Sequence, residues 1–183
     1  MPADWSRIAR RIRVPMGFIF AGFYIWLARP TFISMAWSLL LVIPGLWLRG
    51  YAAGYVKKNA ELTMTGPYSY TRNPLYLGSM LIAFGFAAAS RSIVIVLLLA
   101  ALFALIYIPV IRSEEAFLRS KFAGFDAYAA SVPRLVPRLR PARIETGQGN
   151  FSFPLYRKHR EYNALMGATA IYAVLALRII FKH

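Results

Sequence analysis

Five long apolar runs constrain the fold of this chain more than any other feature of its sequence. Each run holds 15 to 20 residues, and only the last is interrupted by a charge, at Arg178. An α-helix needs about 20 mostly apolar residues to cross the hydrocarbon core of a membrane. The runs are residues 14–28, 31–48, 74–90, 93–111 and 162–181. We therefore predict an all-α, polytopic membrane protein with about five transmembrane helices.

The connections between the runs indicate how these helices pair. Arg29-Pro30 alone separates the first two runs, and Arg91-Ser92 alone separates the third and fourth. Such short connections leave consecutive helices antiparallel, so we expect two tight hairpins. Residues 49–60 contain tyrosines and lysines that suit the level of the lipid headgroups. Residues 112–130 alternate aromatic and charged side chains on a helical period, which predicts that the fourth helix continues out of the membrane.

The basic residues predict the orientation in the membrane. With five helices, 18 of the 22 Lys and Arg residues fall on one side, which includes the N-terminus, residues 49–73 and residues 112–160. Basic residues concentrate in cytoplasmic loops, so we expect these segments to be cytoplasmic. A prokaryotic inner membrane is the default location. The four basic residues on the other side are Arg29, Arg91, Arg178 and Lys182.

The residue types exclude several kinds of site. The chain has no Cys, which rules out disulfides, thiolate metal sites and a Cys nucleophile. Its two histidines, His159 and His183, are too few for a His-rich metal site, so we expect no metal. Basic cytoplasmic loops account for the net charge of +15 without a nucleic-acid partner. No P-loop and no GxGxxG after a strand are present, so a cofactor would be held by something other than a Rossmann fold.

The segment from Thr65 to Gly78, TGPYSYTRNPLYLG, is the part of the first half richest in turn formers and aromatic residues. Gly66-Pro67 ends the preceding segment, because glycine permits a positive φ and proline lacks an N–H. Pro74 suits the first position of a helix. A polar, bent segment at the start of an apolar helix predicts a binding loop at the membrane surface.

The side chains of this loop each have an ordinary explanation as well as a functional one. Tyr68, Tyr70 and Tyr76 either belong to the aromatic belt of the membrane or form the wall of a site for a flat heterocycle. Arg72 is either one more cytoplasmic charge or a binding group, and Asn73 is either a turn former or a polar contact. The residue types alone leave these alternatives open.

Glu114 and Glu115 are adjacent acidic residues in a chain with only seven Asp and Glu. They stand where the fourth apolar run leaves the membrane. One interpretation is a pair of solvated charges near Arg112 and Arg119. The other is a carboxylate at the edge of an apolar pocket, which binds a cation or accepts a proton. Neighbouring residues of a helix point about 100° apart, so we expect only one of them to face a given site.

Taken together, the loop and the glutamate pair resemble a known pattern. The loop fits G-P-Y-x-Y-x-R-[HN]-P-x-Y-x-G, and it is followed by Glu-Glu, by FAGFDAY at 122–128 and by VPRLVP at 132–137. This order is similar to that of the isoprenylcysteine carboxyl methyltransferase and phospholipid methyltransferase superfamily of integral membrane enzymes. The resemblance covers about residues 55–140. It implies transfer of a methyl group from S-adenosylmethionine to a lipophilic acceptor.

The resemblance also implies roles for individual residues. An amine acceptor would give its proton to one glutamate, whereas a carboxylate acceptor would need no base and would be oriented by Arg112 or Arg134. Val110 stands where the prenylcysteine branch has an arginine, which disfavours a prenylcysteine acceptor. The implied catalytic residues are Glu114, Glu115 and Arg112. The implied cofactor-binding residues are Gly66, Pro67, Tyr68, Arg72, Asn73, Pro74, Tyr76, Gly78, Tyr128, Pro133, Arg134 and Pro137.

Two other functions stay open. An NADPH-dependent, sterol-type membrane reductase has a similar motif, although a glutamate pair suits a dinucleotide with a 2′-phosphate poorly. A non-enzymatic scaffold would make the 65–78 loop a structural turn. For the methyltransferase, we expect one domain over residues 1–183. It would consist of an N-terminal hairpin (1–60), a catalytic core (61–140) and an extra transmembrane helix (161–183). Its partners would be membrane lipid and a lipophilic methyl acceptor.

Overall fold

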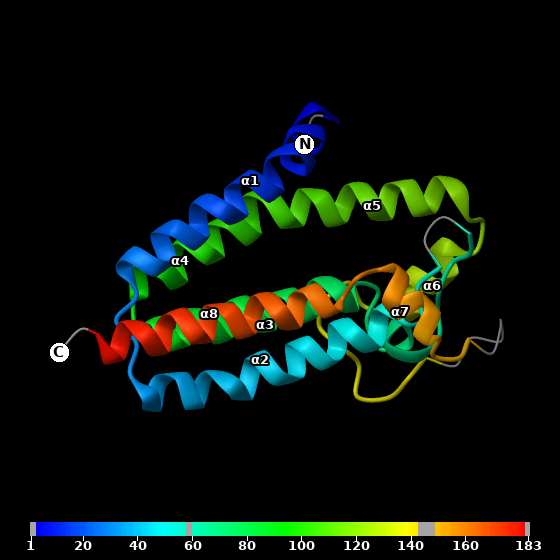
Figure 1. Ribbon diagram of the computed structural model, residues 1–183. Coiled ribbons are helices and arrows are strands. Elements are labelled where there is room, and N and C mark those ends of the chain that lie inside the picture. Colours follow the sequence, from blue (N-terminus) through cyan, green and yellow to red (C-terminus); the bar gives the residue numbers. More distant parts are fainter. Residues whose placement is uncertain (1–2, 58–59, 143–148, 182–183) are drawn as a thin grey trace. The chain divides into compact units, whose positions relative to one another are not determined.

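The computed structural model describes residues 3–57, 60–142 and 149–181, and over these residues the chain is helical with no strand (Figure 1). This confirms the predicted all-α class. The elements are α1 (Ala3–Leu27), α2 (Phe32–Ala53), η1 (Gly66–Ser69), α3 (Pro74–Ser90), α4 (Ile93–Leu102), η2 (Phe103–Tyr107), α5 (Ile108–Lys121), α6 (Phe125–Ser131), α7 (Phe153–Lys158) and α8 (Tyr162–Ile180).

Three helical stretches are long and apolar enough to cross a membrane, namely α2, the continuous stretch Ile93–Lys121 and α8. Two shorter apolar helices, Pro15–Leu27 within α1 and Pro74–Ser90, match the remaining apolar runs. Large apolar side chains on the spans stand exposed, as Ile33, Trp37 and Leu40 do on α2. Such a face is unfavourable in water but matches the lipid of a bilayer. The protein is therefore an integral membrane protein.

The helix ends differ from the sequence predictions at three places. α1 begins at Ala3 rather than near residue 14, because arginines before the apolar run end a membrane span but not a helix. The helix predicted over 112–130 is interrupted: α5 ends at Lys121, and α6 begins after Gly124. Glycine is a poor helix former, and the break allows Phe125 and Tyr128 to be buried. The short α7, in the proline-rich part of the chain, was not predicted.

The chain forms two compact units. Unit 1 comprises Met1–Val42, Ala83–Phe117 and Ala170–His183. Its helices make hydroxyl and ring contacts: the Tyr24 hydroxyl donates to the Phe86 carbonyl oxygen over 2.9 Å, and the Ser38 and Tyr172 hydroxyls are 2.6 Å apart. Gly85 of α3 lies so close to α2 that an added Cβ would be 3.0 Å from the Ser38 carbonyl oxygen. Small residues permit such approaches between helices in lipid.

One turn of unit 1 is a π-helix. η2 lies between α4 and α5, where Phe103 stacks on Phe84 and on Tyr107, with ring centroids 6.0 and 4.5 Å apart. The indole N–H of Trp5 donates to the Leu105 carbonyl oxygen over 3.0 Å, which joins α1 to this turn. A π turn inside an α-helix corresponds to one extra residue.

Unit 2 comprises Ile43–Ile82 and Leu118–Thr169. It contains a close crossing of α2 and α3, where a Cβ added to Gly45 would be 2.8 Å from the Gly78 carbonyl oxygen. The rest of the unit consists of short helices and irregular chain, including the loop singled out in the sequence.

Candidate functional site

The loop of unit 2 forms one turn of 3-10 helix, η1, directly before α3. Gly66 has φ +58°, a left-handed conformation that side chains with a Cβ rarely adopt. Its contact with the Tyr55 ring leaves no room for a Cβ, which would lie 2.5 Å from a ring carbon. Pro67, Tyr68 and Ser69 are buried, and the Ser69 hydroxyl donates to the Gly66 carbonyl oxygen over 2.7 Å. The predicted break at Gly66-Pro67 is thus a defined, packed turn.

A second segment, residues 128–142, fastens onto this loop. The Tyr128 hydroxyl donates to the Tyr68 carbonyl oxygen over 2.8 Å. Thr71, which is 1% exposed, donates through its hydroxyl to the Arg134 and Leu135 carbonyl oxygens at 3.1 and 3.2 Å. We call residues 128–142 the covering segment.

Main-chain hydrogen bonds complete this pairing. The Arg72 N–H donates to the Pro133 carbonyl oxygen over 2.9 Å. In the other direction, the N–H groups of Arg138 and Ala142 donate to the carbonyl oxygens of Tyr70 and Ser69, each over 3.0 Å. Backbone N–H and C=O groups of the loop and the covering segment therefore bond to each other, although neither segment forms a strand.

Arg72 lies beneath the covering segment, beside a buried aromatic cluster. Its guanidinium donates to the Ala129 carbonyl oxygen over 2.9 Å and lies 6.0 Å from the centre of the Phe125 ring. Phe125 packs with Tyr128 and Val132 in a cluster in which each residue is at most 3% exposed. Cation–π attraction and the charge-assisted hydrogen bond both hold Arg72 in place.

A group of aromatic rings surrounds the C-terminal end of α2. Tyr51 stacks on Trp47 and on Phe151, with ring centroids 5.1 and 6.1 Å apart, and its hydroxyl is 3.0 Å from the Tyr55 hydroxyl. The hydrogen bond to Tyr51, burial and repulsion from Tyr51 raise the pKa of Tyr55 to about 12. We call Trp47, Tyr51, Tyr55 and Phe151 the aromatic group.

An ion pair joins α2 to the start of α8 within unit 2. Arg49 contacts both carboxylate oxygens of Glu161, with nitrogen-to-oxygen distances of 3.0 and 2.9 Å. The same guanidinium donates to the Ser79 hydroxyl and the Leu75 carbonyl oxygen of α3. The side chains of Arg49 and Glu161 are only 25% and 11% exposed. Arg49 thus connects three helices.

The predicted cofactor-binding residues come from the loop, the start of α3 and the covering segment. All twelve predicted cofactor-binding residues lie in unit 2. Two of them act mainly through the fold: Gly78 lies at the crossing with α2, and the Asn73 amide donates to the Arg134 carbonyl oxygen over 3.1 Å. Their cofactor-binding role stays a prediction.

The predicted catalytic residues lie on the part of α5 that belongs to unit 1. Glu115 is buried, with 5% of its surface exposed, while Glu114 is half-buried and Arg112 is exposed. The expectation that only one of the two glutamates faces a given site stays a prediction. Their catalytic role, and that of Arg112, stays a prediction.

Sequence reasoning missed three of the residues that build unit 2. Thr71 occupies a variable position of the motif, so nothing distinguished it from other polar loop residues. Arg49 gave a usable signal, because a charge at the end of an apolar run needs a partner. Phe151 gave none, because its partners are almost 100 residues away in the sequence.

Comparison with known proteins places this architecture in context. Residues 23–124 match the sequence pattern of the phospholipid methyltransferase family. The chain is 39% identical over 114 residues to the nickel-cobalt-cadmium resistance protein NccN of Alcaligenes xylosoxydans xylosoxydans. It is 40% identical over 114 residues to the cobalt-zinc-cadmium resistance protein CzcN of Cupriavidus metallidurans.

These matches cover 62% of this chain but only 53% and 52% of the two relatives. The chain thus aligns with about half the length of the curated relatives it matches. No solved structure matches it.

Proposed function

Because the chain belongs to the phospholipid methyltransferase family, we propose that it transfers a methyl group from S-adenosylmethionine to a lipophilic acceptor at the membrane surface. The observation that carries the proposal is the pairing of the loop with the covering segment. Tyr128 binds Tyr68, and Thr71 and Asn73 bind Arg134, so the two parts of the family-like pattern form one framework in unit 2.

The residues of unit 2 fit the chemistry of this cofactor. S-adenosylmethionine supplies an electrophilic methyl group on a sulfonium, next to a flat adenine and a polar ribose. The aromatic group offers ring faces of the kind that pack against adenine. The neutral Tyr55 hydroxyl and the polar atoms of the loop offer hydrogen bonds at the same end of α2.

The chain's own contribution to catalysis is to orient the reactants and to exclude water. A loop tied down by Thr71 and Tyr128 loses little conformational entropy when a ligand binds, which favours tight binding. The proposal gives Glu115 the role of holding a positive charge or taking the proton of an amine acceptor, because a buried carboxylate interacts strongly with a nearby cation. The proposal gives the more exposed Glu114 a supporting role, in which it interacts with the same positive charge from the side that faces water.

The acceptor is proposed to reach the protein through the lipid. The spans leave large apolar side chains exposed, with Trp37 at 67% and Leu40 at 65%, so the helices are in contact with lipid over much of their length. An amino-phospholipid, a prenylcysteine-like carboxylate and another small lipid all fit this route, and Val110 disfavours the prenylcysteine.

The two relatives are named for resistance to nickel, cobalt, zinc and cadmium, so we also searched this chain for a metal site. Among residues 3–57, 60–142 and 149–181, no group of three or more His, Cys, Asp or Glu side chains could hold a metal ion. The sequence also has no Cys.

The first experiment compares binding of S-adenosylmethionine and NADPH to the detergent-purified protein by calorimetry. We expect saturable binding of S-adenosylmethionine only. Binding of NADPH instead would favour the sterol-type reductase, and binding of neither would favour the scaffold. Incubating the protein with labelled S-adenosylmethionine and a lipid extract then identifies the acceptor from the product that carries the label.

A matched pair of variants tests the role of Glu115. We expect Glu115→Gln to lower the rate of methyl transfer about 100-fold, the effect typical of losing a general base. Glu61→Gln removes the same charge from a carboxylate that is 52% exposed and paired with Lys57, so its rate should stay unchanged. A folded Glu115→Gln protein with full activity would remove this carboxylate from the mechanism.

A further inference from the structure

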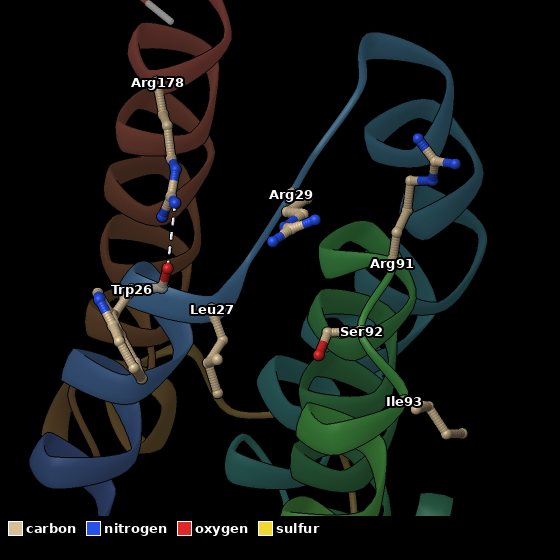
Figure 2. Close-up of a pocket in the computed structure, with 7 residues that line it drawn as sticks. All are labelled: Trp26, Leu27, Arg29, Arg91, Ser92, Ile93 and Arg178. Carbon is tan, nitrogen blue, oxygen red and sulfur yellow. Dashed lines mark hydrogen bonds between the residues drawn. The ribbon is translucent and has the colours of Figure 1, made fainter.

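A pocket of unit 1 is lined by three arginines. It has a volume of about 600 Å³ and lies where α1, α3 and α8 end and α4 begins (Figure 2). In Figure 2, Arg29 stands between Arg178, on the last turn of α8, and Arg91, directly after α3. The complete lining is Trp26, Leu27, Arg29, Arg91, Ser92, Ile93 and Arg178. We call this the arginine pocket.

Among the described residues, no Asp or Glu forms an ion pair with the arginines of this pocket. Residues 5–60, 62–113 and 162–183, which supply the whole lining, contain no Asp or Glu. Arg178 donates to the Trp26 carbonyl oxygen over 3.1 Å, which satisfies the end of α1. Within the described part of the chain, the structure gives the guanidinium groups of Arg29 and Arg91 no acceptor. Three positive charges from segments that hold no Asp or Glu attract an anion.

The topology makes this concentration of charge unexpected. Arg29, Arg91 and Arg178 are three of the four basic residues predicted to lie on the non-cytoplasmic side. Basic residues on that side oppose the positive-inside bias that orients the protein. Their gathering in one pocket therefore calls for a local explanation.

The backbone conformation of Arg91 also supports a binding role for this pocket. Its φ of +54° ends α3 in the left-handed conformation, a position that helices usually fill with glycine because a Cβ is disfavoured there. A glycine would end the helix without strain but would provide no guanidinium. An arginine at this position is explained by a contribution of its side chain to the pocket.

The apolar part of the lining indicates what kind of anion fits. Trp26 is 71% exposed and Ile93 is 68% exposed, beside the arginines. Tryptophan is typical of the headgroup level of membranes, with its ring towards the acyl chains. Guanidinium groups bind phosphate oxygens in pairs. Cationic donors next to exposed apolar side chains match a phosphate that carries acyl chains.

We propose that the arginine pocket binds the phosphate headgroup of an anionic phospholipid, in the leaflet opposite the predicted active site. This lipid is a bound component of the protein and not the methyl acceptor. The proposal is independent of the methyl-transfer reaction, and a failure of either leaves the other standing.

The test measures the melting temperature of the detergent-purified protein with added phosphatidylglycerol, with phosphatidylcholine or with inorganic phosphate. We expect phosphatidylglycerol alone to raise the melting temperature in a saturable manner. An equal shift with inorganic phosphate would overturn the lipid assignment in favour of a soluble anion. An equal shift with phosphatidylcholine would mean that the charge of the headgroup is not recognised.

Variants then connect the effect to the pocket. Arg91→Gly removes a guanidinium and relieves the left-handed strain, so it should melt no lower than the parent without lipid, while its affinity for phosphatidylglycerol falls about tenfold. The double variant Arg29→Gln/Arg91→Gln keeps the contact of Arg178 with Trp26. It should lose almost all of the rise in melting temperature with phosphatidylglycerol.

The double variant Arg140→Gln/Arg157→Gln is the charge-matched control, because it removes two exposed arginines of unit 2. It should keep the rise in melting temperature. Equal losses in both double variants would reduce the effect to net charge and overturn the proposal.

Discussion

In unit 1, whole helices are joined by ring packing and a few hydroxyl contacts, whereas in unit 2 irregular chain is fastened by hydrogen bonds between the loop and the covering segment. Tyr24 and Ser38 illustrate the first case, because each side chain reaches a neighbouring helix whose backbone is already satisfied. Arg72 and Thr71 illustrate the second, since they bind main-chain carbonyl groups of residues 129–135.

The difference follows from the surroundings of each unit. Lipid offers no hydrogen bonds, so backbone within it must be helical or otherwise satisfied internally. A segment such as residues 65–73 is stable only where another segment or water meets its polar groups. Unit 2 therefore combines irregular chain with many polar backbone contacts, whereas the backbone groups of unit 1 are mostly paired within its helices.

Among the variants that test this comparison, we expect the largest loss of unfolding free energy at the ion pair between Arg49 and Glu161 in unit 2. Arg49→Met leaves Glu161 without its partner in a site where the carboxylate is 11% exposed, so we expect a loss of about 3 kcal/mol in unfolding free energy. Equilibrium unfolding in mixed micelles measures it. Lys57→Met breaks an exposed pair, 52% exposed on both sides, and should cost less than about 1 kcal/mol. Equal costs for the two variants would mean that burial does not strengthen the Arg49 contacts.

The next effect tests the close packing of unit 1. A Cβ at Gly85 would lie 2.6 Å from a methyl group of Val42 and 3.0 Å from the Ser38 carbonyl oxygen. Gly85→Ala should therefore lower the unfolding free energy by about 1 to 3 kcal/mol.

Gly22 of α1 provides the control within the same unit, because nothing lies within 4 Å of its Cβ position. Gly22→Ala should raise the unfolding free energy by up to about 1 kcal/mol through helix propensity. If both alanines stabilise the protein, α2 and α3 are not closely packed at Gly85.

The smallest effect separates stability from function. Tyr128→Phe in unit 2 and Tyr24→Phe in unit 1 each remove one buried hydroxyl that donates to a carbonyl oxygen, at 2.8 and 2.9 Å. Each should cost about 1 kcal/mol of unfolding free energy. Only Tyr128→Phe should also weaken binding of S-adenosylmethionine, measured by calorimetry, because it loosens the covering segment. Equal binding by the two variants would contradict a binding role for unit 2.

The sequence predicted the helices well where apolar residues alone define them. α3 spans the predicted residues 74–90, and Pro74 opens it as expected. The prediction failed where a helix continues beyond the apolar run, as at the start of α1, or stops inside an amphipathic pattern, as at Lys121. Helix formation and membrane insertion respond to different properties of the side chains, and an apolar run reports only the second.

The sequence singled out several residues that join the loop to the covering segment, but it did not predict their contacts. The resemblance singled out Tyr68, Tyr128 and Arg134, and all three lie in the pairing of the loop with the covering segment. Arg134 takes part through its carbonyl oxygen, which every residue has, and its side chain is exposed. Pairing through the main chain leaves no mark in the amino-acid sequence.

The π turn at Phe103–Tyr107 affects the direction in which the two glutamate side chains point from the helix axis. Because it inserts one residue, every side chain of α5 after it is rotated by about 100° relative to an uninterrupted α-helix. Ile111 and Glu115 are four residues apart and share one face of α5, which is the buried face in this structure, and Glu114 lies beside it. The number of residues between Ile93 and Tyr107 therefore determines which side chains of α5 face the interior of the protein. Which glutamate is buried depends on that count as much as on the glutamates themselves.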